Sequence, residues 1–182
     1  MSCESIIEFR CFNPRRNLPP SVGSKRGEAN FVGAFERGFT AGRAGRGVGG
    51  RHFAMSGYGI ADFVWAEPGT GKGSTSKLTA FEMKLRDWRR ALTQAYRYSY
   101  FADASIVVLP VGVADKAEEH LHVFERLGIG LWSCDPNSER IDMRFTPKGT
   151  HARNPAAREK ALGAISRKVK FRKLGKQADA FL

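Results

Sequence analysis

Gly57-Tyr-Gly-Ile-Ala-Asp62-Phe-Val-Trp65 and Leu78-Thr-Ala-Phe-Glu82-Met-Lys84 are the two stretches of sequence that decide the fold. Both are short apolar and aromatic runs, a composition typical of strands. Residues 67–77 between them are rich in turn-forming residues, so the two strands are expected to pair antiparallel through a long hairpin. Glu82 and Lys84 stand two positions apart, and side chains at that spacing leave the same face of a strand. The two stretches therefore predict that Asp62, Glu82 and Lys84 come together.

The elements predicted around these strands follow the order α-β-β-β-α-β. Apolar residues at helical spacing predict helices over residues 24–40, 87–101 and 114–127, and Gly128 ends the last of these. Apolar runs predict further strands over residues 52–56, 105–110, 129–133 and, at an edge of the sheet, 139–145. Residues 1–12 fit a short strand or an ordered arm. The sequence therefore predicts an α/β fold with a mixed sheet flanked by helices.

The last part of the chain differs from the rest in composition. Between His151 and Leu182 there are nine lysines or arginines and two acidic residues. Four apolar residues fall on one face of a basic amphipathic helix in this part: Ala161, Leu162, Ile165 and Val169. We therefore divide the chain into a domain over residues 1–145 and a basic helical C-terminal extension over residues 146–182.

The charge of the chain indicates its kind of partner. It carries 30 lysines and arginines against 18 acidic residues, a formal net charge of +12 over 182 residues. This balance predicts a polyanion as partner, most simply DNA or another nucleic acid, and less often an anionic membrane surface. No window approaches 18 uninterrupted apolar residues, so no membrane span is expected. Cys3, Cys11 and Cys134 have no regular spacing, which fits a reducing, cytoplasmic location rather than a disulfide framework.

Two neighbouring carboxylates and a lysine form a set suited to the hydrolysis of phosphodiester bonds. The carboxylates of Asp62 and Glu82 repel each other, which favours a divalent cation between them, Mg²⁺ or Mn²⁺. A water held by such a cation can be the nucleophile. The ammonium of Lys84 can orient that water and stabilise the charge that develops on phosphorus. The alternative is structural, with a surface salt bridge between Glu82 and Lys84 while Asp62 caps a turn.

These motifs resemble those of a known family. Gly59-Ile60-Ala61-Asp62, then Phe81-Glu82-Met83-Lys84, then a helix and the apolar strand 105–109 are similar to the PD-(D/E)xK, or restriction-endonuclease-like, nuclease superfamily. The resemblance spans roughly residues 24–133, and Ala61 replaces the proline usual before the aspartate. It implies a Mg²⁺-dependent nuclease acting on DNA. Asp62, Glu82 and the backbone carbonyl of Met83 would hold the metal, and Lys84 would position the attacking water.

The resemblance also assigns roles on the two flanking helices. Gln94 and Tyr98 match the Gln-x-x-x-Tyr pattern of one branch, the helicase-associated and viral exonucleases, in which the glutamine helps hold the active site and the tyrosine contacts DNA. The alternative is that both are ordinary residues of a helix surface. The family often adds an acid from the first helix, for which Glu28 is the first choice and Glu36 the second.

Basic residues near the motifs are candidates for phosphate contacts. Arg90 and Arg97 lie near the face of Gln94, Lys72 and Lys77 lie in the hairpin tip, and the glycine-rich segment 41–51, predicted to be a flexible loop, adds three arginines. The full set of nucleic-acid contacts is Tyr98, Arg97, Arg90, Lys72, Lys77, Arg43, Arg46 and Arg51. For segment 41–51, a solvated linker is an equal alternative.

Three functions are compatible with the sequence. The first is the metal-dependent deoxyribonuclease just described. The second is a nucleic-acid-binding module of the same fold without catalysis, although such a module has no reason to keep all of Asp62, Glu82 and Lys84. The third is an interaction protein whose basic tail binds an acidic partner. Nucleases of this class that act on junctions or restriction sites are commonly dimers, so a homodimer is an open alternative.

Overall fold

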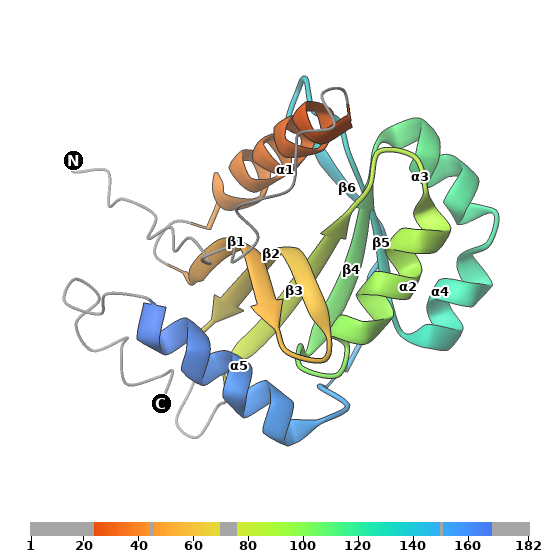
Figure 1. Cartoon of the computed structure of the whole chain (residues 1–182). Coiled ribbons are helices and arrows are strands. Elements are labelled where there is room, and N and C mark those ends of the chain that lie inside the picture. Colours follow the sequence, from red (N-terminus) through yellow and green to blue (C-terminus); the bar gives the residue numbers. More distant parts are fainter. Residues whose placement is uncertain (1–23, 44–45, 70–75, 150, 169–182) are drawn as a thin grey trace, which may run out of the picture.

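A six-stranded mixed sheet organises the protein, and its strands lie in sequence order from β1 to β6. The computed structural model describes residues 24–43, 46–69, 76–149 and 151–168 (Figure 1). The helices are α1 Ser24–Thr40, α2 Trp88–Tyr98, α3 Val111–Glu118, α4 Leu121–Leu127 and α5 Pro155–Lys168. The strands are β1 Val48–Met55, β2 Gly59–Glu67, β3 Lys77–Met83, β4 Ala104–Leu109, β5 Gly130–Cys134 and β6 Ile141–Phe145. The predicted arm over residues 1–12 lies outside the described residues.

Strand pairing follows the predicted α/β pattern. β1, β2 and β3 pair antiparallel in turn, β3 and β4 as well as β4 and β5 pair parallel, and β5 pairs antiparallel with the edge strand β6. Every residue of β4 is buried, as its continuous apolar run predicted. The antiparallel pairing of the strands that carry Asp62 and Glu82 is therefore confirmed, and so is the mixed sheet flanked by helices.

Alternating residues of the central strands face opposite sides of the sheet. Phe63 and Phe81 pack with Phe35 and Phe39 of α1 on one side. Val64, Leu78 and Ala80, at the alternate positions, belong to a second cluster that includes residues of α2 and α5. A third cluster joins α2, α3 and α4 to β4 and β5. Successive side chains of a strand point to opposite faces. Among the described helices, α1 therefore covers one face of the sheet, while α2 to α5 cover the other.

The prediction of one helix over residues 114–127 is wrong. Two short helices, α3 and α4, replace it, with His120 at the start of α4 in a non-helical conformation. The imidazole of His120 stacks on Trp88 of α2, with ring centroids 5.1 Å apart. The break lets Ala117 of α3 and Phe124 of α4 both reach the same buried cluster. The predicted end at Gly128 is confirmed, and its backbone is left-handed with φ of 68°.

The prediction of a flexible loop over residues 41–51 is wrong for its last part, because β1 begins at Val48. Gly49 fits in this strand for a steric reason. A Cβ at Gly49 would come within 2.7 Å of the Phe63 ring and 2.8 Å of the Trp65 ring. The glycine therefore allows β1 to pass close to aromatic side chains of β2.

Helix α5 packs on the sheet, beside β1 to β3 in Figure 1. Ala157, Ala161 and Ile165 are buried in the same cluster as Leu78 and Ala80. Arg158 also holds α5 through an ion pair with the buried Asp103, with 2.6 Å between Nε and Oδ1. The apolar face predicted for residues 161–165 thus lies in the core, while Val169 falls outside the described residues. None of the helices in the described ranges is long and apolar enough to cross a membrane.

Candidate active site

The register of β2 on β3 brings the two predicted carboxylates together. Phe63 lies opposite Phe81 and Val64 opposite Ala80, so continuation of the same register places Asp62 opposite Glu82. Glu82 lies opposite Val107, in the last pair but one between β3 and β4. Lys84 follows directly after β3. The site therefore forms at the carboxyl end of β3.

The ammonium of Lys84 lies among all three groups predicted to hold a metal. Its Nζ is 2.8 Å from Oε1 of Glu82 and 4.0 Å from Oδ2 of Asp62. It also donates a hydrogen bond of 3.2 Å to the backbone carbonyl of Met83. Asp62 Oδ2 accepts a hydrogen bond of 2.8 Å from the Met83 N–H, which fixes its carboxylate against β3. The structure thus brings together the residues that the motif predicted.

Burial governs the charge state of this cluster. Glu82 is only 1% exposed. Burial and then the neighbouring charge of Asp62 raise the pKa of Glu82 to about 7, although Lys84 opposes the shift. Burial likewise raises the pKa of Asp62, again against the effect of Lys84. Burial acts to lower the pKa of Lys84, but the carboxylates of Glu82 and Asp62 outweigh it, and the pKa is raised. Lys84 is therefore charged at neutral pH, whereas Glu82 exchanges its proton near pH 7.

Tyr98 does not lie where a contact with DNA would require. Its side chain is 1% exposed, and its hydroxyl oxygen is 2.7 Å from Oε2 of Glu82 and 2.7 Å from the carbonyl oxygen of Ile60. Helix α2 brings it there because Tyr98 falls on the buried face with Ala91 and Ala95. The predicted contact with nucleic acid is therefore replaced by an internal role, in which Tyr98 holds the carboxylate of Glu82.

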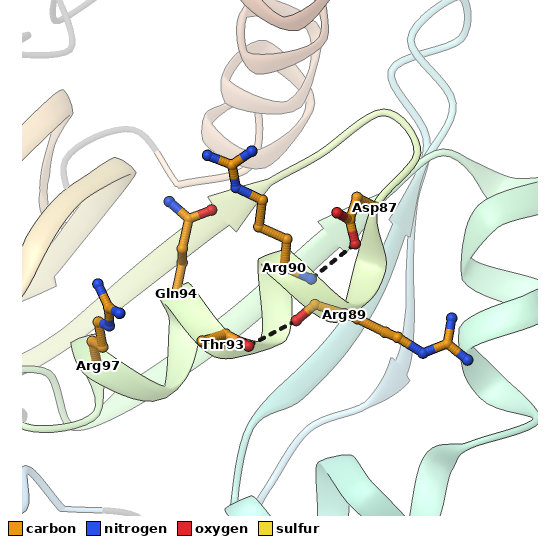
Figure 2. A pocket seen from close by; sticks show the side chains of 6 residues that line it. All are labelled: Asp87, Arg89, Arg90, Thr93, Gln94 and Arg97. Carbon is orange, nitrogen blue, oxygen red and sulfur yellow. Dashed lines mark hydrogen bonds between the residues drawn. The ribbon is translucent and has the colours of Figure 1, made fainter.

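Gln94 lies four residues before Tyr98 and is half-buried. It makes no hydrogen bond to Asp62 or Glu82 within the described residues. Its Oε1 is buried and accepts no hydrogen bond there. Figure 2 shows Gln94 pointing to the same side of α2 as Arg90 and Arg97, where the three line a hollow. The structure thus places Gln94 beside the predicted phosphate contacts.

The structure separates the two candidate acids of α1. Glu36 forms an ion pair with Arg51 of β1, so its carboxylate is already engaged. Glu28 is half-buried, and its negative charge raises the pKa of both Asp62 and Lys84. Glu28 is therefore the acid of α1 that lies within electrostatic reach of the site.

The remaining basic residues that were predicted to contact phosphates differ in whether their side chains are already engaged within the protein. Arg43 donates a hydrogen bond of 2.7 Å to the Phe39 carbonyl and lies 4.1 Å over the Phe39 ring, while Arg46 is exposed. Lys77 is exposed at the first residue of β3. At about 3.3 Å per residue it lies about 23 Å along the chain from Lys84. Lys72 falls outside the described residues.

His52 is a residue of the site that the sequence did not indicate. It lies on β1 between Arg51, which is opposite Phe63, and Phe53, which is opposite Ala61, so the register places it across from Asp62. Its charge acts to lower the pKa of Asp62. His52 is exposed and its φ of 53° is left-handed, a conformation uncommon for residues other than glycine. Only strand pairing brings His52 beside Asp62, and no spacing in the sequence could have shown it.

The donor set fits a hard divalent cation that keeps much of its water. No cluster of three or more histidine, cysteine, aspartate or glutamate side chains able to hold a metal occurs in the described ranges. Mg²⁺ is commonly bound by one or two carboxylates, with waters completing its shell. Asp62, Glu82 and the Met83 carbonyl are of that kind. Oε1 of Glu82 also accepts no well-aligned hydrogen bond, although Lys84 Nζ is 2.8 Å away, so this oxygen can still serve a cation.

Neither a scan of protein-family models nor a search of curated protein sequences gives a match to this chain.

Proposed function

We propose that the protein is a divalent-metal-dependent nuclease with a restriction-endonuclease-like core, acting on phosphodiester bonds of DNA. The observation that carries this proposal is the position of Lys84 Nζ. It lies 2.8 Å from Glu82, 3.2 Å from the Met83 carbonyl and 4.0 Å from Asp62. A positive charge is thus already held at the meeting point of the three groups that the motif assigns to a metal.

The order of the elements supports the same proposal. α1, β1, β2, β3, α2 and β4 follow one another, with the first three strands antiparallel and β4 parallel to β3. Asp62 lies on the second strand, while Glu82 and Lys84 lie at the end of the third. This arrangement is the one that the resemblance to PD-(D/E)xK nucleases implies.

Each residue of the cluster has a chemical role in this proposal. Asp62, Glu82 and the Met83 carbonyl would hold Mg²⁺ or Mn²⁺, which when bound supplies neutralising charge and a water of lowered pKa. Lys84 has three N–H donors, which can orient the attacking water and stabilise the added charge on phosphorus. Tyr98 keeps Oε2 of Glu82 in place from the buried side.

The test is cleavage of linear duplex, branched and single-stranded DNA with Mg²⁺, Mn²⁺ or EDTA. Lys84→Ala and Glu82→Ala should each lower the cleavage rate by at least about 10³-fold while the protein stays folded, since each removes a group that acts on the reacting phosphate. Lys116→Ala is the matched control for Lys84→Ala, because Lys116 is exposed on α3 and its loss changes the net charge equally. Equal activity of Lys84→Ala and the wild type would overturn the proposal. Metal-independent DNA binding with no cleavage would favour the inactive binding module.

A further inference from the structure

Strand β1 reverses the direction of its side chains partway along its length. Arg51 and Phe53 are two positions apart, a spacing that ordinarily places two side chains on the same face of a sheet. Arg51 instead forms an ion pair with Glu36 of α1, on one face. The ring of Phe53 lies 5.9 Å from that of Phe101, in the cluster on the other face. The alternation of β1 is therefore reversed at His52.

Strand β2 reverses at the same level. Phe63 packs in the cluster that contains α1, whereas Ala61 belongs to the cluster that contains residues of α2 and α5. Asp62 lies between these two residues. The register leaves one residue between the paired positions on each strand, so His52 and Asp62 lie opposite each other and no residue is inserted. The two strands thus turn together as one ribbon, without the extra residue of a β-bulge.

The ribbon of β1 and β2 leaves β3 at this level. Backbone pairing between β2 and β3 ends with Phe63 and Phe81. Pairing between β2 and β1 continues as far as Gly59. Two positions beyond Phe81, the N–H of Met83 donates to the carboxylate of Asp62, with 2.8 Å between nitrogen and Oδ2. The turn of the ribbon therefore opens the place beside β3 in which the carboxylate of Asp62 lies.

The backbone of His52 has the conformation that accompanies this turn. Its φ is 53°, in the left-handed region that residues with a side chain rarely adopt. Among the described residues other than glycine, Glu139 alone shares this feature, and it lies in the connection between β5 and β6. His52 is in the interior of a strand. Strained backbone of this kind persists where the surrounding structure enforces it, and it is concentrated at functional sites.

The neighbours of His52 enforce its conformation, whereas its own side chain does not. The ion pair of Arg51 with Glu36 fixes one side of the turn. The packing of Phe53 on Phe101 fixes the other. The imidazole of His52 is exposed and forms no hydrogen bond within the described ranges. What the fold uses at this position is therefore the backbone.

We propose that His52 is a positioning residue of the candidate active site and acts through its backbone. Its left-handed conformation turns the ribbon of β1 and β2 away from β3, and this turn directs the carboxylate of Asp62 to the Met83 N–H and to the place assigned to a cation. The inference rests on the proposed function for the identity of the cation alone. The direction of the Asp62 carboxylate does not depend on it.

The test compares His52→Gly with His52→Val, two variants that both lack the imidazole. Glycine adopts positive φ readily, whereas a β-branched residue does so very rarely. Hydrogen exchange of the Met83 amide, followed by NMR in EDTA, reports on its bond to Asp62. Exchange should be at least about tenfold faster than wild type in His52→Val and within about threefold of wild type in His52→Gly. The amides of Trp65 and Thr79, in the paired part of β2 and β3, should keep their wild-type rates in both variants.

Titration with Mn²⁺ alone, followed by the paramagnetic signal of the free ion at pH 8, measures the consequence for a cation. His52→Val should bind Mn²⁺ at least about tenfold more weakly than His52→Gly, the loss typical when a group that orients a metal ligand is removed. Asparagine tolerates the left-handed region, so His52→Asn should lie within about threefold of His52→Gly.

Two controls separate backbone strain from the direction of Asp62. Ala54→Val introduces the same residue at an exposed position of β1 and should change neither amide exchange nor Mn²⁺ affinity. Glu139→Val meets the second left-handed backbone. It should lower the melting temperature, as His52→Val does, and leave the Met83 amide and Mn²⁺ affinity unchanged.

Equal exchange of the Met83 amide in the valine and glycine variants of His52 would overturn the proposal. If His52→Val does not fold, His52→Ala takes its place in the same comparison, since alanine also disfavours positive φ. A protein that binds no Mn²⁺, but whose Met83 amide depends on His52 as stated, would refute the metal site alone. Mn²⁺ binding and Met83 exchange that are both unaffected by His52→Val would refute the role of His52 alone.

Discussion

The hydroxyl oxygen of Tyr98 on α2 lies 2.7 Å from Oε2 of Glu82 on β3, and both side chains are 1% exposed. The same hydroxyl is 2.7 Å from the carbonyl oxygen of Ile60 on β2. One buried group therefore ties a helix to the two strands that carry the candidate active site. The hydroxyl has a single proton, so when Glu82 is ionised and can only accept, Tyr98 is the group that donates to it.

Tyr98→Phe should raise the pKa of Glu82 above its value of about 7, because the hydrogen bond from Tyr98 lowers that pKa. Carbon-detected NMR titration of the glutamate carboxyl would measure the shift. Loss of the bond should also lower the free energy of unfolding by about 1–2 kcal/mol, measured by urea denaturation at pH 8. Tyr96→Phe is the control, since the Tyr96 hydroxyl makes no hydrogen bond within the described residues. An unchanged carboxyl pKa in Tyr98→Phe would contradict the role given to this residue.

Glu82→Gln should change how stability depends on pH. The pKa of Glu82 is raised from 4.5 to about 7 in the folded protein. The folded state therefore binds more protons than the unfolded state between these values, and stability falls as pH rises from about 4.5 to 7. At about 1.4 kcal/mol per pH unit, the loss reaches on the order of 3 kcal/mol.

The glutamine variant lacks this titration, so its stability relative to the wild type should increase from pH 5 to pH 8 by that amount. Thermal and urea unfolding at both pH values would measure it. Glu119→Gln serves as the control, because Glu119 is exposed. A difference between variant and wild type that stays constant from pH 5 to 8 would show that Glu82 has an ordinary pKa.

Affinity for a divalent cation should rise with pH up to about 7 and then level off. Glu82 must lose its proton to coordinate, and its pKa is about 7, so Mn²⁺ affinity should increase about tenfold per pH unit below that value. Calorimetry or the paramagnetic signal of free Mn²⁺ would measure binding without any substrate. Asp62→Asn should weaken binding by at least tenfold, whereas Asp142→Asn on the edge strand should not. Binding that is independent of pH from 5 to 8 would place the cation elsewhere.

Ile165→Ala should destabilise the whole domain. Ile165 of α5 is 1% exposed and packs in the cluster that holds Leu78 and Ala80 of β3. Removal of this buried side chain should cost about 2–5 kcal/mol, seen as a single cooperative transition by circular dichroism. Lys160→Ala, an exposed position on the same helix, should change stability by less than about 0.5 kcal/mol. A second, separate transition for α5 would instead support a division of the chain near residue 146.

Much of the local structure could be predicted because it depends on short-range pattern. Helix α1 has the predicted bounds, and β4 and β6 lie where apolar runs and turns placed them. The break between α3 and α4 could not be predicted, because the apolar spacing over residues 114–127 also suits one continuous helix. Contacts of Trp88 with His120, far apart in the sequence, accompany the break. Similarly, the glycines of β1 predicted a loop, because the close approach of Phe63 and Trp65 that favours glycine in this strand is known only from the tertiary structure.

The sequence by itself determined that Asp62, Glu82 and Lys84 would share one end of a strand pair, since a period of two and one hairpin suffice for that. Only the tertiary structure decided what surrounds them. It buried Tyr98 against Glu82, paired Glu36 with Arg51 so that Glu28 is the acid near the site, and set His52 across from Asp62. The reason is physical: side-chain direction follows from the local backbone, whereas burial, pKa and partners depend on residues that only the packed sheet brings within a few ångströms.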